Sequence, residues 1–218
     1  MATRFFGRPL LSVAVLATAC STVAPPPAQS LTVDALHALP TQRYAISPED
    51  AALDFAVKPL GFPAVRGSFA GFDGAVEIES ARDEKIKVRA TVDLDSVRFG
   101  SDWYENVVKS PAWFDVEHHP EAVFTGELAG WNGEGTGSVQ GEITIKGITR
   151  PAEFMIRLDC EVAEPCPKDA VGFSGEIVIN RRDFEMNEFR GLVGNEVTLH
   201  FSGALVTESA RYAETTRR

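Results

Sequence analysis

The chain has 218 residues, of which 44% are hydrophobic and 24% are charged, a composition typical of a globular protein and not of a disordered, collagen-like or polytopic membrane protein. Its formal charge of −10 offers no counterion-release route onto a phosphate backbone, so we expect no nucleic-acid partner. With three cysteines and four histidines, the chain has few potential Cys and His ligands for a metal site.

Residues 1–19 are predicted to be a secretory signal peptide. Arg4 and Arg8 form a basic start, residues 10–19 are apolar, and small residues precede Cys20. A spanning helix needs about 20 apolar residues, so this stretch is too short to remain as an ordinary anchor. Residues 17–20 resemble a bacterial lipobox, which favours acylation of Cys20, although Ala17 stands where a lipobox usually has Leu. A plain Ala-x-Ala cleavage site followed by a coincidental cysteine is the alternative.

Residues 20–41 are predicted to be the lipidated cysteine and a Pro/Ala-rich linker. The run Pro25-Pro26-Pro27 cannot pack a core and is typical of an extended spacer. Ser21 is compatible, by resemblance to lipoprotein sorting signals, with the outer membrane. The sequence therefore predicts a periplasmic protein anchored to the outer membrane of a bacterial envelope. Residues 208–218 are predicted to be a polar tail.

Residues 42–207 are predicted to form one all-β domain. Apolar residues alternate with polar ones, as in Leu53, Phe55 and Val57, and again in the run from residue 197 to residue 201. Such a period of two places one face of an antiparallel strand on an apolar interior and the other in water. Clusters of Gly, Asp, Asn and Pro separate the runs, as hairpins require. About eight to ten short strands are expected.

One segment, residues 102–109, breaks the period of two. Trp103 and Val107 lie one helical turn apart, Asp102 with Glu105 resembles a capping box, and Pro111 follows. The segment predicts a short helical insertion that could cover one end of a barrel.

No catalytic constellation stands out. His118 and His119 lie close to Asp115 and Glu117, but neighbouring residues on a strand point to opposite faces, so this pair chelates a metal poorly. The Gly-rich run at 133–137 lacks the following helix that would make it a phosphate loop. The sequence favours a protein that is not an enzyme and needs no metal or cofactor. A metal-dependent hydrolase that uses His118 or His119 is the less favoured alternative.

Cys160 and Cys166 are separated by five residues between two strand-like runs. This spacing differs from the Cys-x-x-Cys of zinc and redox motifs. A hairpin disulfide in an oxidising compartment is predicted, and it would contribute roughly 2 kcal/mol. Two free buried thiols are the alternative.

A set of short segments between residues 43 and 206 resembles the YceI-like family of bacterial periplasmic, lipocalin-like polyisoprenoid-binding proteins. The order and spacing of these segments carry the resemblance: 44–46, 53–57, 65–69, 110–115, 119–120 with Phe124, 141–151, 179–186 and 193–197. The resemblance implies a lipocalin-like antiparallel barrel of about eight strands that holds an amphiphile with a long isoprenoid or acyl tail, which agrees with the alternation. The sequence departs from the family pattern at residues 105–107, at Glu185 and at Ala51-Ala52.

The predicted ligand-binding residues are apolar and lie on the inward face of alternating runs or near the helical insertion. They are Phe55, Val57, Phe69, Val88, Val92, Trp103, Trp113, Phe124, Phe154, Ile156, Phe173, Ile177 and Phe201. An isoprenoid tail accepts no hydrogen bond, so complementarity must come from area and shape. The same side chains could instead fill the barrel, which would make the protein a structural or stress-related envelope protein. The oligomeric state does not follow from the sequence.

Overall fold

The structure is a computed structural model that describes residues 29–30, 41–59, 64–80, 85–132, 135–160 and 170–207. The strands are β1 (Gln29–Ser30), β2 (Gln42–Ile46), β3 (Ala51–Pro59), β4 (Val65–Phe69), β5 (Phe72–Ser80), β6 (Lys85–Asp93), β7 (Val97–Arg98), β8 (Glu121–Trp131), β9 (Thr136–Ile145), β10 (Ile148–Cys160), β11 (Ala170–Asn180) and β12 (Val193–Thr207). The described helical elements are α2 (Asp102–Lys109) and two 3-10 turns, η1 (Leu94–Ser96) and η2 (Arg181–Phe184). None of the described helices has the length and apolarity to cross a membrane.

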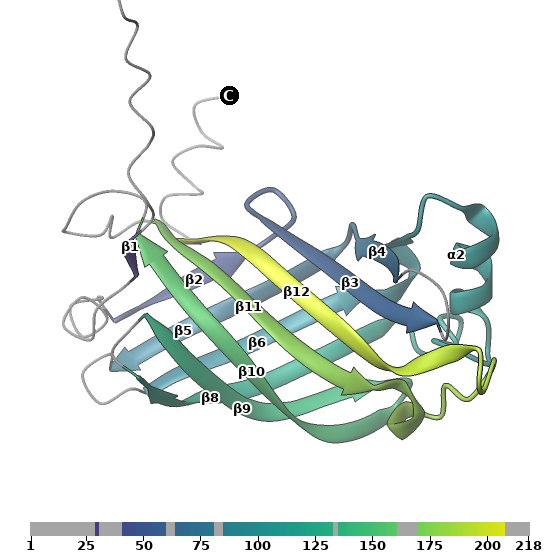
Figure 1. Cartoon of the computed structure of the whole chain (residues 1–218). Coiled ribbons are helices and arrows are strands. Elements are labelled where there is room, and N and C mark those ends of the chain that lie inside the picture. Colours follow the sequence, from purple (N-terminus) through teal and green to yellow (C-terminus); the bar gives the residue numbers. More distant parts are fainter. Residues whose placement is uncertain are drawn as a thin grey trace, which may run out of the picture.

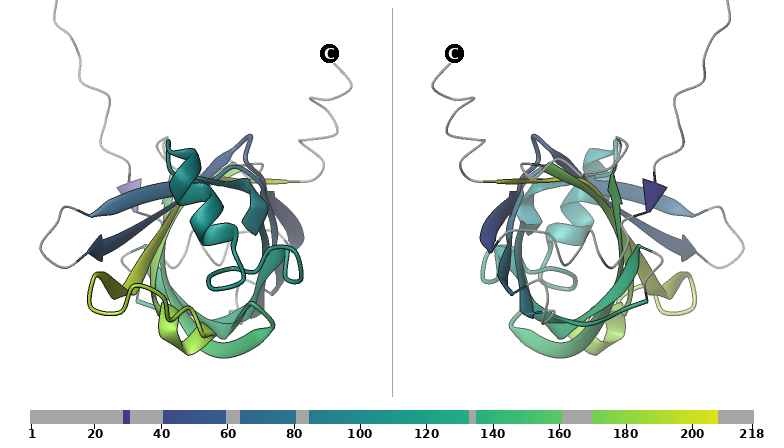
Figure 2. Two further views of the ribbon diagram at one scale, coloured as in Figure 1. Left: turned by 90° about the vertical axis from the view of Figure 1, so that its right-hand side faces the viewer. Right: turned by 90° about the vertical axis from the view of Figure 1, so that its left-hand side faces the viewer.

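Eight strands form a closed antiparallel barrel (Figures 1 and 2). The ring runs β2, β5, β6, β8, β9, β10, β11, β12 and returns to β2. It closes where Val206 and Thr207 of β12 pair with Ala45 and Tyr44 of β2. Closure pairs strands that would otherwise be the two edges of an open sheet. The predicted antiparallel barrel of about eight strands is confirmed.

The long strand β12 also pairs with β3, and this pairing extends the wall toward the other end of the barrel. There β3 pairs with β4, and β4 pairs with the short strand β7. Helix α2 follows β7 and lies across this end of the barrel, as the left view of Figure 2 shows. We call the end beside α2 the helix end and the end where β12 meets β2 the closure end.

The period of two sorts the side chains into an interior and an exterior. In β10, Leu158 is buried whereas Met155 is 56% exposed, and in β11, Val171 is buried whereas Val178 is 53% exposed. The buried apolar residues form one cluster that includes Tyr44 at the closure end and a second cluster toward the helix end.

The predicted helix at 102–109 is confirmed, but its predicted capping box is wrong. The N-cap residue is Ser101, and its side chain makes no capping hydrogen bond. Glu105 therefore stands one position beyond the place that a capping box requires. Its Oε1 accepts a hydrogen bond from the backbone N–H of Phe99 at 2.9 Å, which ties the helix to the segment that precedes it.

Several sequence predictions fall outside the described residues. Residues 1–28, with the signal peptide and Cys20, are among them, as are Cys166 and the tail at 208–218. Cys160 ends β10, so its disulfide with Cys166 stays a prediction that intact mass under non-reducing conditions would test. Within the predicted linker, β1 pairs with the end of β10.

Candidate functional site

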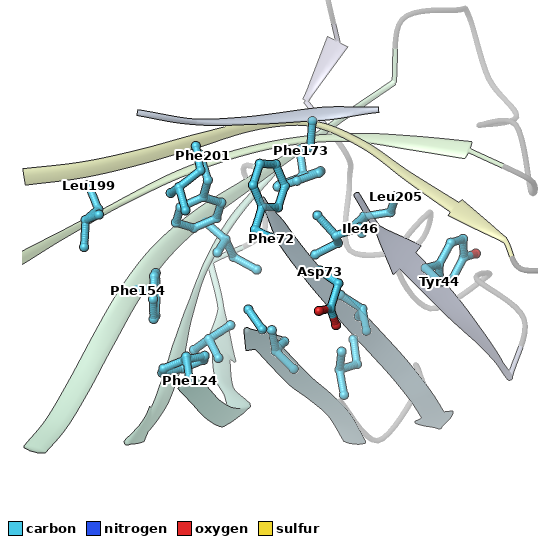
Figure 3. A pocket seen from close by; sticks show the side chains of 18 of the residues that line it. Tyr44, Ile46, Phe72, Asp73, Phe124, Phe154, Phe173, Leu199, Phe201 and Leu205 are labelled. Atoms are coloured by element: carbon cyan, nitrogen blue, oxygen red, sulfur yellow. The ribbon is translucent and has the colours of Figure 1, made fainter. Parts of the chain in front are cut away.

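A first apolar cavity of about 180 Å³ lies inside the barrel toward the closure end. Figure 3 shows the rings of Phe124, Phe154, Phe173 and Phe201 around it, with Tyr44 at one end. Among the described lining residues, Asp73 alone is charged, and it is exposed to solvent. For comparison, an engineered apolar cavity of about 150 Å³ stays dry and binds benzene. The first cavity therefore suits a hydrocarbon group.

A second apolar cavity of about 290 Å³ lies at the helix end. Its wall includes Phe55 and Phe69 from the barrel, while α2 contributes residues such as Trp103 and Val107. The apolar face of the predicted helical insertion thus forms part of a cavity wall.

The two cavities are adjacent inside the barrel. Five residues line both of them: Leu53, Val92, Ala122, Ile143 and Leu199. These residues come from five different strands, β3, β6, β8, β9 and β12, and form the wall that the two cavities share. All five are apolar, so the shared wall presents no polar side chain to a hydrocarbon chain in either cavity.

Two glycines keep large rings close to the barrel wall. Gly175 is the cross-strand partner of Phe201, and a Cβ on it would lie 2.4 Å from Cζ of that ring. Gly67 has the same relation to Phe55, again with a distance of 2.4 Å to Cζ. Because glycine has no side chain, each ring lies across its partner strand and takes less of the interior. These pairs depend on the strand register, so they cannot be predicted from the alternation within one strand.

The structure places twelve of the thirteen predicted ligand-binding residues on the cavity walls. Val88, Val92, Phe124, Phe154, Ile156, Phe173 and Phe201 line the first cavity. Phe55, Val57, Phe69, Trp103 and Trp113 line the second, and Val92 lines both. Ile177 lines neither cavity and packs within the buried cluster of the helix end. Contact between these side chains and a ligand stays a prediction.

Arg181, which was not among the predicted site residues, lines the second cavity and is fully buried. Its Nε donates to the carbonyl oxygen of Gly194 at 2.9 Å, its Nη2 to that of Val193 at 3.1 Å, and its Nη1 to that of Met186. Its guanidinium carbon lies 5.1 Å from the ring centre of Trp113. Burial is the main cause that lowers the pKa of Arg181. The hydrogen bonds of Arg181 thus hold η2 against Met186 and the start of β12 at the helix end.

The two adjacent histidines lie outside both cavities. Nδ1 of His118 lies 2.9 Å from Oδ1 of Asp115, and this hydrogen bond raises the pKa of His118 and lowers the pKa of Asp115. His119 packs against the turn at Gly147, where a Cβ would lie 3.0 Å from its ring. Within the described ranges, no group of three or more His, Cys, Asp or Glu side chains is placed to hold a metal ion. The structure thus puts His118 in a surface ion pair.

Sequence comparison finds relatives over most of the barrel. The family model of the YceI-like domain matches residues 44–205. A UPF0312 protein of Pseudomonas putida (strain W619) is 30% identical over 138 residues, which cover 62% of this chain and 71% of that protein. A UPF0312 protein of Pectobacterium carotovorum subsp. carotovorum (strain PC1) is 28% identical over 151 residues, which cover 69% and 78% of the two chains.

Solved structures with the same fold include BcnA of Burkholderia cenocepacia, with a TM-score of 0.65 and 22% identity over 74% of this chain and 99% of that one. A polyisoprenoid binding domain from Saccharophagus degradans, implicated in plant cell wall breakdown, gives a TM-score of 0.58 and 12% identity over 77% and 99% of the two chains. At these identities the likeness concerns the fold. Because the family model spans the whole barrel from β2 to β12, the chain belongs to the YceI-like family.

Proposed function

We propose that the protein binds one long-chain amphiphile, of polyisoprenoid or similar type, and sequesters or carries it in the barrel. The observation that carries this proposal is the pair of apolar cavities that share five apolar wall residues. Each buried CH₂ group contributes about 0.8 kcal/mol, so three isoprene units supply on the order of 10 kcal/mol before the entropy of association is subtracted. Useful affinity therefore needs no charged contact with the head group.

The family and its structural neighbours support this reading. The Saccharophagus degradans domain, which is described as polyisoprenoid binding, has the same barrel fold. The cavity walls in this chain fit such a ligand, since hydrocarbon is complementary to the Phe, Val, Leu and Ile side chains that dominate them. This function is one of binding, without chemistry on the ligand.

Titration of lipid-free protein with geranylgeraniol tests the proposal. Trp131 lines the first cavity, and Trp103 and Trp113 line the second, so a bound prenyl chain is expected to change the tryptophan fluorescence. We expect saturation at one ligand per chain with a Kd of about 1 µM or tighter. A folded, lipid-free protein that takes up no prenyl alcohol and no fatty alcohol would contradict the proposal.

The second candidate function is that of a structural or stress-related envelope protein with a side-chain-filled barrel. The observation that favours it is a chain of ring contacts inside the first cavity. The ring centres of Phe124 and Phe154 lie 4.3 Å apart, those of Phe154 and Phe201 lie 5.3 Å apart, and those of Phe173 and Phe201 lie 6.0 Å apart. Failure of the titration with a folded protein would favour this second function.

The proposal also includes a location, namely the periplasmic side of a bacterial envelope with an outer-membrane anchor at Cys20. The order of a basic start, an apolar stretch and small residues before the cysteine supports it. Labelled palmitate is expected to enter the native protein and not the Cys20→Ser variant, because the diacylglycerol is attached through that sulfur. Equal labelling of the two forms would contradict the anchor.

A further inference from the structure

Exposed apolar side chains gather around the second cavity. Of the described residues, six large hydrophobic side chains are exposed, and four of them line this cavity: Trp103, Tyr104, Phe189 and Leu192. We call these four side chains the apolar rim. Leu192 is 63% exposed and Trp103 is 60% exposed, so each contributes to the cavity wall and to the outer surface. The other two, Met155 and Val178, lie on the outer wall of the barrel.

The apolar rim comes from two segments that meet at the helix end. Trp103 and Tyr104 belong to α2, and Phe189 and Leu192 belong to the connection between η2 and β12. The left view of Figure 2 shows the helix and this connection at the same end of the barrel. A groove of about 410 Å³ runs between them, and Phe189 also contacts Trp113 at 6.2 Å between ring centres.

The backbone holds the second segment in a fixed turn. The N–H groups of Leu192 and Val193 both donate to the carbonyl oxygen of Phe189 at 3.0 Å. Phe189 has a φ of 53°, a left-handed conformation that is rare for a bulky residue and that tends to occur at functional positions. The turn therefore keeps two large apolar side chains at the surface, although burying them would stabilise the fold.

Charge and composition indicate what this surface contacts. Arg190 stands between the two rim residues of the turn and is exposed. Asp102, Asp183 and Glu188 are exposed as well, in α2, in η2 and in the connection that follows η2. The surface around the rim therefore carries both signs of charge, and Arg190 is the cation placed to contact an anionic head group beside Phe189 and Leu192. Trp and Tyr side chains, with an apolar ring and a polar edge, favour the boundary between hydrocarbon and water. Exposed apolar patches of this kind mark interaction sites.

We propose that the apolar rim docks on a lipid bilayer and that the amphiphile passes between the bilayer and the second cavity through it. This inference rests on the proposed function. A prenyl or acyl tail that crosses water exposes every CH₂ group, whereas a cavity whose mouth touches the bilayer avoids that exposure. The rim residues line the mouth and face outward, as this route requires.

Flotation of the full chain with vesicles tests the inference. The Cys20→Ser variant is the background, because an acyl anchor would hold any variant on a membrane. Vesicles of phosphatidylcholine with phosphatidylglycerol are compared with vesicles of phosphatidylcholine alone. Leu192→Ser is expected to weaken vesicle binding about tenfold and to slow prenol transfer from the vesicles. Met155→Ser and Val178→Ser, which remove equally exposed apolar side chains from the barrel wall, are the matched controls and are expected to bind like the parent.

Arg190→Gln separates the charge from the apolar contact. It is expected to weaken binding to vesicles that contain phosphatidylglycerol, to change binding to phosphatidylcholine alone much less, and to leave geranylgeraniol affinity in solution unchanged. Vesicle binding that survives Leu192→Ser and Phe189→Ser together, or that the two controls weaken equally, would overturn the inference. A parent protein that is dimeric in sedimentation and becomes monomeric with Leu192→Ser would overturn it too, in favour of a second copy. Geranylgeraniol titration of the parent reports separately on the proposed function.

Discussion

Replacing Gly175 with alanine is predicted to push the Phe201 ring into the first cavity. A Cβ at this position would lie 2.4 Å from Cζ and 2.6 Å from Cε2 of that ring, and 2.8 Å from the carbonyl oxygen of Met155. Ordinary contact begins at 3.4 Å, so the ring edge has to move by about 1 Å. The interior is the side with free volume, because Phe201 lines the cavity of about 180 Å³.

Gly175→Ala is expected to lower the free energy of unfolding through overpacking and to lower prenol affinity through the loss of cavity volume. Overpacked side chains cost about 1–3 kcal/mol, so we expect Gly175→Ala to lower the free energy of unfolding by about 2 kcal/mol. The shift also disturbs the ring contacts of Phe201 with Phe154 and Phe173. If the displaced ring takes the room of one CH₂ group, prenol affinity falls about fourfold.

A double-mutant cycle with Phe201→Leu separates the clash of the added Cβ with the Phe201 ring from its clash with the carbonyl oxygen of Met155. We expect Phe201→Leu to cost about 1 kcal/mol less in the Gly175→Ala background than in the parent, as measured by chemical denaturation. Gly130→Ala is the control, because a Cβ there meets nothing within 4 Å and should cost little. Additive effects of Gly175→Ala and Phe201→Leu on the free energy of unfolding would show that the added methyl group does not displace the Phe201 ring.

Three further predictions concern single sites. Phe154→Asp should lose bound lipid while remaining folded by circular dichroism, since a carboxylate in a dry cavity admits water or takes up a proton; His118→Ala should retain lipid, and the opposite pattern would favour a polar site. Arg181→Met should lower the free energy of unfolding by about 3 kcal/mol, because three backbone carbonyls lose their donor; unchanged denaturation would show that these bonds contribute little. The ion pair of His118 with Asp115 should stabilise the fold most between pH 3.8 and pH 6.5, the ordinary pKa values of the two groups. Its contribution is lost as pH rises through the raised pKa of His118, because the imidazole then loses its charge. It is also lost as pH falls through the lowered pKa of Asp115, because the carboxylate is then protonated. Thermal unfolding of the parent and of His118→Gln across pH measures this contribution, and a constant difference between the two proteins would contradict it.

Most of the barrel could be predicted because the alternation of apolar and polar residues can be recognised within each strand separately. The alternation of Leu53, Phe55 and Val57 gives the inward face of β3 without knowledge of any other strand. The helix could likewise be predicted from the spacing of Trp103 and Val107. The capping of that helix could not, because the partner of Glu105 is the backbone N–H of Phe99, which lies before the N-cap residue.

The finer features of the site depend on strand register and on tertiary packing. The pairing of Gly175 with Phe201 follows from the alignment of β11 with β12, which composition does not reveal. Arg181 follows an alternating strand, where a charged side chain is ordinarily exposed, yet it is buried and donates hydrogen bonds to the carbonyl oxygens of Met186 and of Val193 and Gly194 at the start of β12. Ile177 has the same inward pattern as Phe173, but packing, not sequence, decides that it lines neither cavity.

Organic extraction and mass spectrometry of protein purified from its native envelope determine whether the barrel holds a lipid. We expect a prenyl or acyl lipid at close to one molecule per chain, released by denaturation and absent from a folded Phe154→Asp variant prepared in the same way. Recovery of lipid-free, folded protein from that envelope, with no prenyl or acyl lipid above the level found with Phe154→Asp, would contradict this expectation.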